Sequence, residues 1–197
     1  MSTFRQRLSD LARTTPVLAW IGFSVSLGFL GLAGVMVAGY TLTDPGGWTG
    51  PGLTALWVIP SLGLAAVSFY RPDTAVPALA VASLAPLGFG VWTLVDYEGA
   101  RGWEDQHGPV SLVFVLAVGL PLAVEGLARP MPAGVMMLAT TVVPWVLSMV
   151  GAGSDWGQAL SIGLLSAPVV ASGVLYLLAG RTRTRAQTGP PRVLAGH

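Results

Sequence analysis

Residues 109–151 read PVSLVFVLAVGLPLAVEGLARPMPAGVMMLATTVVPWVLSMVG, and this stretch decides the class of fold. Two apolar runs, 109–128 and 132–151, flank the dipeptide Arg129-Pro130, and Glu125 is the one further charge. A helix rises about 1.5 Å per residue, so each run can cross the roughly 30 Å of hydrocarbon in a bilayer. The segment is therefore expected to form two membrane-spanning helices joined by a tight polar turn.

The same pattern extends over the whole chain of 197 residues, of which 53% are apolar and 10% charged. A soluble domain carries about 25% charged residues, so a water-soluble globule is excluded. In lipid, a continuous apolar run forms a helix because a helix satisfies the hydrogen bonds of its backbone N–H and C=O groups internally. The sequence predicts an all-α integral membrane protein, a six-transmembrane-helix bundle forming one domain over 1–180, with a flexible basic tail over 181–197. The expected spans are 17–40, 51–70, 76–95, 109–128, 132–151 and 158–179.

The arginines predict the orientation, because positively charged segments stay in the cytoplasm. Arg101 alone falls on the outer side of the predicted spans, and the other nine arginines fall on the inner side. Both termini are therefore expected to be cytoplasmic, in the plasma membrane of a bacterium whose GC-rich genome explains the absence of Lys and Asn. Trp20, Tyr70 and Tyr176 are expected to mark the inner interface. The arginines beside the predicted spans include Arg71, Arg129, Arg181, Arg183 and Arg185.

An internal repeat is indicated by matches at an offset of 58 residues. Arg71-Pro72 corresponds to Arg129-Pro130, and Pro86 corresponds to Pro144. The pattern predicts a parallel tandem repeat of helical hairpins, formed by the second and third spans and by the fourth and fifth. The alternative is that short cytoplasmic turns favour Arg and Pro independently.

Each span from the second to the sixth has a proline near its middle, and proline kinks a helix by removing one hydrogen bond. Five kinks at similar depth predict a midplane cavity, although packing of neighbouring helices would instead close the bundle. The residues expected around such a cavity are Pro60, Pro86, Pro121, Pro144, Pro168, Thr140, Thr141 and Ser166.

No ionisable residue lies at the predicted midplane, which argues against driven ion transport. Glu125 lies one helical turn before Arg129, near the cytoplasmic end of its span. An ion pair between these two residues is the expected explanation of Glu125, and a proton relay is the alternative.

Small residues form stripes on the first and last spans, and such stripes let helices approach closely in lipid. They predict either packing between the two spans or a docking face for a second copy or another membrane protein. The stripe residues are Gly22, Ser26, Gly34, Ala38, Ala159, Gly163, Ala167 and Ala171.

The chain lacks the usual signatures of chemistry. It has no Cys, only two His, no zinc-protease motif and no phosphate-binding loop. We therefore expect no enzymatic activity, no cofactor and no binding of nucleic acid. The most polar external segment is interpreted as a solvated loop, or as a weak candidate site for a divalent cation; the side chains concerned are Asp96, Glu98, Glu104, Asp105 and His107.

These features favour a non-enzymatic membrane protein with an interaction or structural role. In size, six spans and cytoplasmic termini, the chain is also similar to the substrate-capture subunits of energy-coupling-factor vitamin transporters. That resemblance implies a solute-binding subunit or small transporter for a neutral or apolar ligand, docked to its partner through the first or last span. An open midplane cavity would favour ligand binding, and a tightly packed bundle would favour a structural role.

Overall fold

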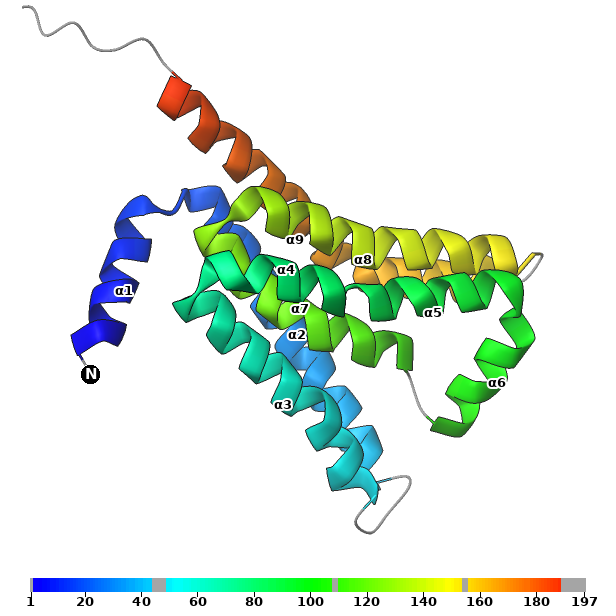
Figure 1. Ribbon diagram of the computed structural model, residues 1–197. Helices are drawn as coiled ribbons and strands as arrows, with labels where there is room; N and C mark the ends of the chain where they lie inside the picture. The colour runs from blue at the N-terminus through cyan, green and yellow to red at the C-terminus, as the bar shows by residue number, and fades with distance from the viewer. Residues whose placement is uncertain (1, 44–48, 108–109, 154–155, 189–197) are drawn as a thin grey trace, which may run out of the picture.

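The computed structural model describes residues 2–43, 49–107, 110–153 and 156–188, and all regular structure in these ranges is helical (Figure 1). The predicted all-α fold is therefore confirmed. The helices are α1 (Ser2–Thr14), α2 (Val17–Thr43), α3 (Thr49–Tyr70), α4 (Pro72–Ala82), α5 (Leu84–Val95), α6 (Tyr97–His107), α7 (Val110–Ala128), α8 (Pro130–Gly151) and α9 (Trp156–Thr188).

Five stretches of the described residues are long and apolar enough to cross a membrane, in agreement with a helical membrane bundle. The five are Val17–Gly39, Pro72–Val95, Val110–Ala128, Pro130–Gly151 and Gly163–Arg183. The remaining predicted span, 51–70, falls in α3, whose apolar part is the shorter Trp57–Tyr70. The side chains of Leu53 and Leu56 lie outside the described part of the structure, so the sixth crossing stays a prediction.

The predicted span 76–95 is not one continuous helix but divides into α4 and α5 at Ser83. Pro86 has no amide hydrogen to donate to the Ala82 carbonyl, so the helical ladder loses a bond at this point. The Ser83 hydroxyl donates to the Leu79 carbonyl oxygen at 2.7 Å, a back-bond of the kind that bends helices. Both pieces still belong to one apolar stretch, Pro72–Val95.

Two helices lie outside the predicted spans. The N-terminal helix α1 is amphipathic, and Arg7 in it donates to the carbonyl oxygens of Phe69 and Tyr70 at 3.1 and 2.8 Å. These bonds satisfy the exposed C-terminal carbonyls of α3. The second helix, α6, occupies the segment that was predicted to be an external loop, and the prediction of a loop is wrong. Asp96 begins α6 by accepting a hydrogen bond from the Gly99 amide at 2.9 Å.

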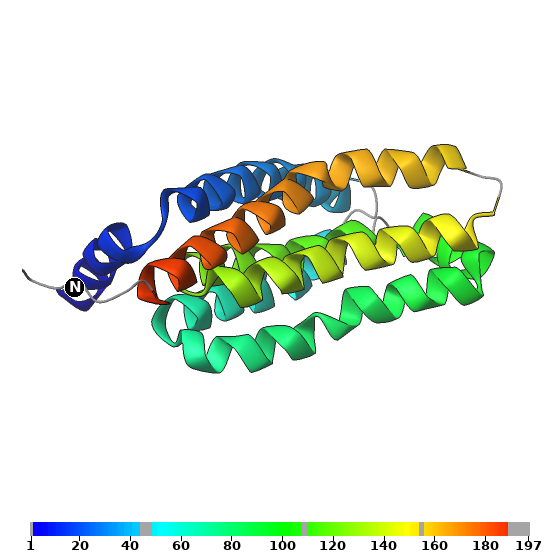
Figure 2. The same ribbon diagram turned by 90° about the horizontal axis from the view of Figure 1, so that it is seen from above.

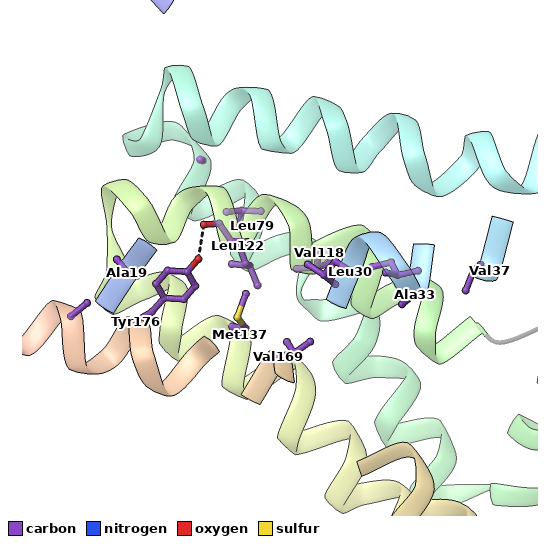
Figure 3. Packing of buried hydrophobic residues seen from close by; sticks show 14 residues of the cluster. Ala19, Leu30, Ala33, Val37, Leu79, Val118, Leu122, Met137, Val169 and Tyr176 are labelled. Atoms are coloured by element: carbon purple, nitrogen blue, oxygen red, sulfur yellow. Dashed lines mark hydrogen bonds between the residues drawn. The ribbon is translucent and has the colours of Figure 1, made fainter. Parts of the chain in front are cut away.

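Helix α7 lies at the centre of the bundle, in contact with α2, α3 and α8, while α9 packs along α8 and α2 (Figures 1 and 2). Half of the residues in the α7 span are buried, more than in the other long spans. Figure 3 shows the core around it, where Leu122 and Leu79 meet Met137, Val169 and Tyr176. The centre of the bundle is therefore filled by side chains.

The arginine-bearing segments other than α6 gather at one end of the bundle. Helix α1, the C-terminal part of α9 and the turns from α3 to α4 and from α7 to α8 lie at this end in both views (Figures 1 and 2). The segment 181–197, predicted as a flexible tail, continues α9 as helix to Thr188, and residues 189–197 lie outside the described ranges. We call the end of the bundle formed by α1, the C-terminal part of α9 and these two turns the arginine end.

Candidate functional site: a cleft between two helices

Helices α8 and α9 are in close contact towards the arginine end. A Cβ atom added to Gly173 would lie 2.8 Å from Cγ of Leu138, and one added to Gly180 would lie 3.0 Å from Cβ of Met131. Glycine at these positions lets the two helices approach closely. The sequence analysis missed both glycines, although their seven-residue spacing is a signal for one helix face.

Further from the arginine end, the same two helices enclose a half-open cleft of about 480 Å³. Small-molecule sites span roughly 300–1,000 Å³, so the volume is that of a binding site. None of the described residues lining the cleft is charged, and only Thr141 and Ser166 contribute hydroxyl groups. The lining residues are Thr141, Val142, Trp145, Gly163, Ser166, Ala167, Val170 and Ala171.

The two walls of the cleft differ. The α8 wall carries Trp145, whose indole lies over Gly163, so that any side chain at residue 163 would collide with the ring. The α9 wall is made of small residues, of which Ala167 and Ala171 are exposed. A cleft with an aromatic wall, a small-residue wall and no charge can bind apolar surface, whereas it offers nothing to an ion.

The structure does not bring the five predicted midplane prolines to a common cavity. Thr141 and Ser166 line the cleft, and Pro144 and Pro168 lie within one turn of its lining residues. The other predicted members lie elsewhere: Pro86 and Pro121 are buried, Pro60 is exposed, and the Thr140 hydroxyl bonds to the Met136 carbonyl oxygen at 2.8 Å. Neighbouring helices fill the space at Pro86 and Pro121, as the alternative interpretation expected.

The two predicted small-residue stripes have different surroundings. On α2, a Cβ atom at Gly22 would lie 3.4 Å from the Ser172 carbonyl oxygen of α9. Buried Ser26 points to Met137 of α8, with 3.9 Å between Oγ and Sδ, and Gly34 faces the Trp57 ring. The α2 stripe is thus an internal packing surface, which Ala38 continues as a half-buried residue.

On α9, Gly163, Ala167 and Ala171 line the open cleft instead of meeting α2. The side chain of Ala159 lies outside the described part of the structure. The first and last spans therefore pack through Gly22 of the α2 stripe and through residues of α9 outside its own stripe.

The acidic residues around α6 act in backbone hydrogen bonding and do not converge. Asp96 accepts from the Gly99 amide, and Glu104 accepts from the Ser111 amide at 2.7 Å. His107 stacks on Trp103 with 4.8 Å between ring centroids. In the described ranges, no three His, Asp or Glu side chains, with Glu98 and Asp105 included, form a group that could hold a metal ion.

The arginines form contacts at the arginine end. Arg129 forms an ion pair with Asp73 of α4 and not with Glu125, so the predicted intrahelical pair is absent. Arg183 donates to the Ala128 carbonyl oxygen at 3.0 Å. Arg71 and Arg181 are exposed, and the side chain of Arg185 lies outside the described part.

Tyr176, which was predicted to mark the inner membrane interface, packs inside the helical bundle. Its side chain has no exposed surface, and its hydroxyl donates to the Ala123 carbonyl oxygen at 2.8 Å (Figure 3). A buried tyrosine needs such a partner because its hydroxyl loses water.

No protein family, curated protein or solved structure matches the chain. The similarity to energy-coupling-factor subunits therefore gains no support from these comparisons. Interpretation of function depends on the apolar helical bundle and on the cleft between α8 and α9.

Proposed function

We propose that the chain is a non-enzymatic membrane protein that binds a transmembrane helix of a second membrane protein in the cleft between α8 and α9. The exposed α9 residues Ala167 and Ala171 are the observation that supports this role, while Gly163, one turn away, is covered by the Trp145 indole. Small residues four apart present a smooth strip along one helix face, which lets a second helix backbone approach closely in lipid.

The test is to fill the cleft and measure co-purification. Ala167→Trp places an indole in the cleft, and Leu164→Trp places the same indole on α9 at an exposed residue outside the lining. After purification in mild detergent, we expect a stoichiometric membrane-protein partner with the wild type and Leu164→Trp, and its loss with Ala167→Trp. A partner that is retained equally by both variants would contradict the proposal.

A second candidate function is the binding of a neutral, apolar small molecule, which the cleft volume of about 480 Å³ favours. The same purified samples distinguish the two functions when small molecules are analysed by native mass spectrometry. A retained apolar compound without a protein partner, lost in Ala167→Trp, would replace the first proposal by this one. An ATPase module among the partners would support a transporter subunit.

We also propose that α3 completes a sixth crossing and that both termini are cytoplasmic in a bacterial plasma membrane. The gathering of arginines at one end supports this orientation. The native chain has no cysteine, so Gly102→Cys and Thr182→Cys each introduce a single thiol. We expect impermeant thiol reagents to label Gly102→Cys in intact cells and Thr182→Cys only after permeabilisation. The opposite labelling would reverse the orientation.

A further inference from the structure

Buried side-chain polar atoms that lack a hydrogen-bond partner collect at one helix interface. Among the described residues these atoms are Trp57 Nε1, Ser61 Oγ, Ser68 Oγ, Glu125 Oε1 and Glu125 Oε2. Residues 57, 61 and 68 share one face of α3, because their spacings of four and seven are helical. Glu125 lies on α7, which packs against α3. We call these four residues the α3–α7 polar stripe.

Glu125 is the chemically decisive member of the stripe. Its side chain has no exposed surface, and the Ser68 hydroxyl of α3 lies beside its carboxyl group. Neither Ser68 Oγ nor either carboxyl oxygen completes a hydrogen bond in the structure. An ionised carboxylate buried in a protein interior is unfavourable unless a cation or several donors compensate for its charge. Glu125 therefore requires a ligand that binds carboxyl oxygen.

The helices around α7 offer no cation for this purpose. Helices α2, α5 and α8 contain no Asp, Glu, Lys, Arg or His. Arg129 follows the C-terminal end of α7 and is the charged residue nearest to Glu125 in the sequence. Its side chain is paired with Asp73 of α4. In α9, Arg183 bonds to the Ala128 carbonyl oxygen and Tyr176 bonds to the Ala123 carbonyl oxygen.

Further arginines lie at the ends of these helices, and among the described ones Arg5, Arg13 and Arg181 are exposed. Arg7 of α1 is bonded to the C-terminal carbonyls of α3, and Arg71 is exposed in the turn that follows. The charged residues of α6 lie at the other end of the bundle (Figure 1). The ligand of Glu125 must therefore come from outside the set of described side chains.

A proton fits this site better than a metal ion. Hard cations take about six or more oxygen ligands, whereas the stripe brings only the two oxygens of Glu125 and the hydroxyl of Ser68 together. A proton needs one oxygen and no cavity. A serine hydroxyl both donates and accepts hydrogen bonds and can therefore relay a proton, whereas an indole N–H only donates.

We propose that Glu125 is a proton-binding site and that it exchanges its proton with water at the arginine end through the adjacent Ser68 hydroxyl. The proton moves from water to one carboxyl oxygen of Glu125 and returns by the same route, with Ser68 as the adjacent hydroxyl. Ser61 and Trp57 extend the polar stripe away from Glu125, so that it covers about 16 Å of α3 at 1.5 Å per residue. This inference is independent of the cleft between α8 and α9.

The chain offers a direct way to observe this proton, because Glu98, Glu104 and Glu125 are its only glutamates. The double variant Glu98→Gln/Glu104→Gln, labelled with ¹³C-carboxyl glutamate, reports on Glu125 alone. Infrared spectroscopy of this protein in lipid is expected to show a carboxylic-acid band that shifts after transfer to D₂O. The band is expected to disappear in Glu125→Gln. If Glu125→Gln does not fold, the labelled double variant still assigns the band.

Serine variants test the path. We expect Ser68→Ala to slow the exchange of the acid band about tenfold, as the loss of one hydrogen-bonding relay group predicts. Ser161→Ala is the control, because its hydroxyl bonds to the Gly157 carbonyl oxygen on α9. A carboxylate band without an acid band would overturn the proposed site. An acid band that does not exchange with D₂O, or that exchanges equally fast in Ser68→Ala, would overturn the proposed path.

Discussion

The hairpin of α3, α4 and α5 and the hairpin of α7 and α8 share a turn but differ in the helix that follows it. Arg71 has φ −139° and ψ 67°, and Arg129 has φ −133° and ψ 75°. In both turns the arginine amide donates at 2.7 Å to the carbonyl oxygen four residues earlier, on Val67 or Glu125. A residue before proline avoids the helical region, and proline then begins the next helix. The same dipeptide therefore produces the same turn twice.

After the turn, the two hairpins differ. Helix α8 is continuous through Pro144, whereas the other chain segment divides at Ser83, before Pro86. Each proline removes the same hydrogen bond, so the surroundings must account for the difference. Helix α8 packs against α5 and α9, while α4 packs against α3 and α7, and α5 packs against α8 and α6 (Figure 2). The break at Ser83 lies where the main neighbours of the segment change from α3 and α7 to α8.

The largest expected effect comes from separating the two hairpins where they touch. A Cβ atom at Gly90 of α5 would lie 2.7 Å from Cα and 2.9 Å from Cβ of Pro144 in α8. Backbone and a proline ring cannot move aside, so Gly90→Leu should lower the free energy of unfolding by about 2–3 kcal/mol. Thermal unfolding in detergent, followed by tryptophan fluorescence, measures the change.

Gly88 provides the matched control, because a Cβ atom added there meets nothing within 4 Å. Gly88→Leu should change the free energy of unfolding by no more than about 0.5 kcal/mol. Equal destabilisation by the two variants would mean that the contact between Gly90 and Pro144 does not hold the hairpins together.

The sequence predicts the hairpin of α7 and α8 well. The expected runs 109–128 and 132–151 correspond to Val110–Ala128 and Pro130–Gly151, because long apolar runs and an Arg-Pro turn are local signals. The break at Ser83 is not predictable in this way. Pro86 and Pro144 give the same local signal, and only the packing of neighbouring helices distinguishes them.

The cleft is predictable only in part, for a related reason. The sequence analysis selected Thr141, Ser166 and Gly163, but it placed the hydroxyls and the glycine in separate sites. Helix α9 is apolar on all sides within the membrane, so its pattern does not show which face meets α8. The small residues at 163, 167 and 171 therefore cannot be distinguished from the packing glycines Gly173 and Gly180 without the structure.

An intermediate effect is expected from removing each mid-helix proline. Pro86→Ala restores an amide that can bond to the Ala82 carbonyl, so α4 and α5 should straighten into one helix. Spin labels at the exposed residues Thr74 and Leu94 should then move apart in electron paramagnetic resonance measurements. The free energy of unfolding should change by only about 1 kcal/mol, because one hydrogen bond is gained while buried packing is disturbed.

Pro144→Ala is the comparison for this experiment, with labels at the exposed residues Val135 and Val150 of α8. The distance between these labels should stay nearly constant, because α8 is already continuous. If both proline variants lengthen their segments equally, the surroundings do not account for the difference between the hairpins.

The smallest effect is expected at the ion pair that links the two turns. Arg129 of the second turn binds Asp73 of the first, but their side chains are 42% and 81% exposed. Exposed ion pairs contribute about 0–1 kcal/mol and weaken in salt, so Asp73→Asn should cost less than about 0.5 kcal/mol at low salt. At the repeat offset of 58 residues, Asp73 of the first turn corresponds to Met131 of the second. The second turn therefore offers Arg71 no equivalent acidic partner. Arg71→Gln, which removes an arginine from the same kind of turn, is the control. If Asp73→Asn instead cost several times as much as Arg71→Gln, the second turn would depend on the ion pair and not on its Arg-Pro backbone alone.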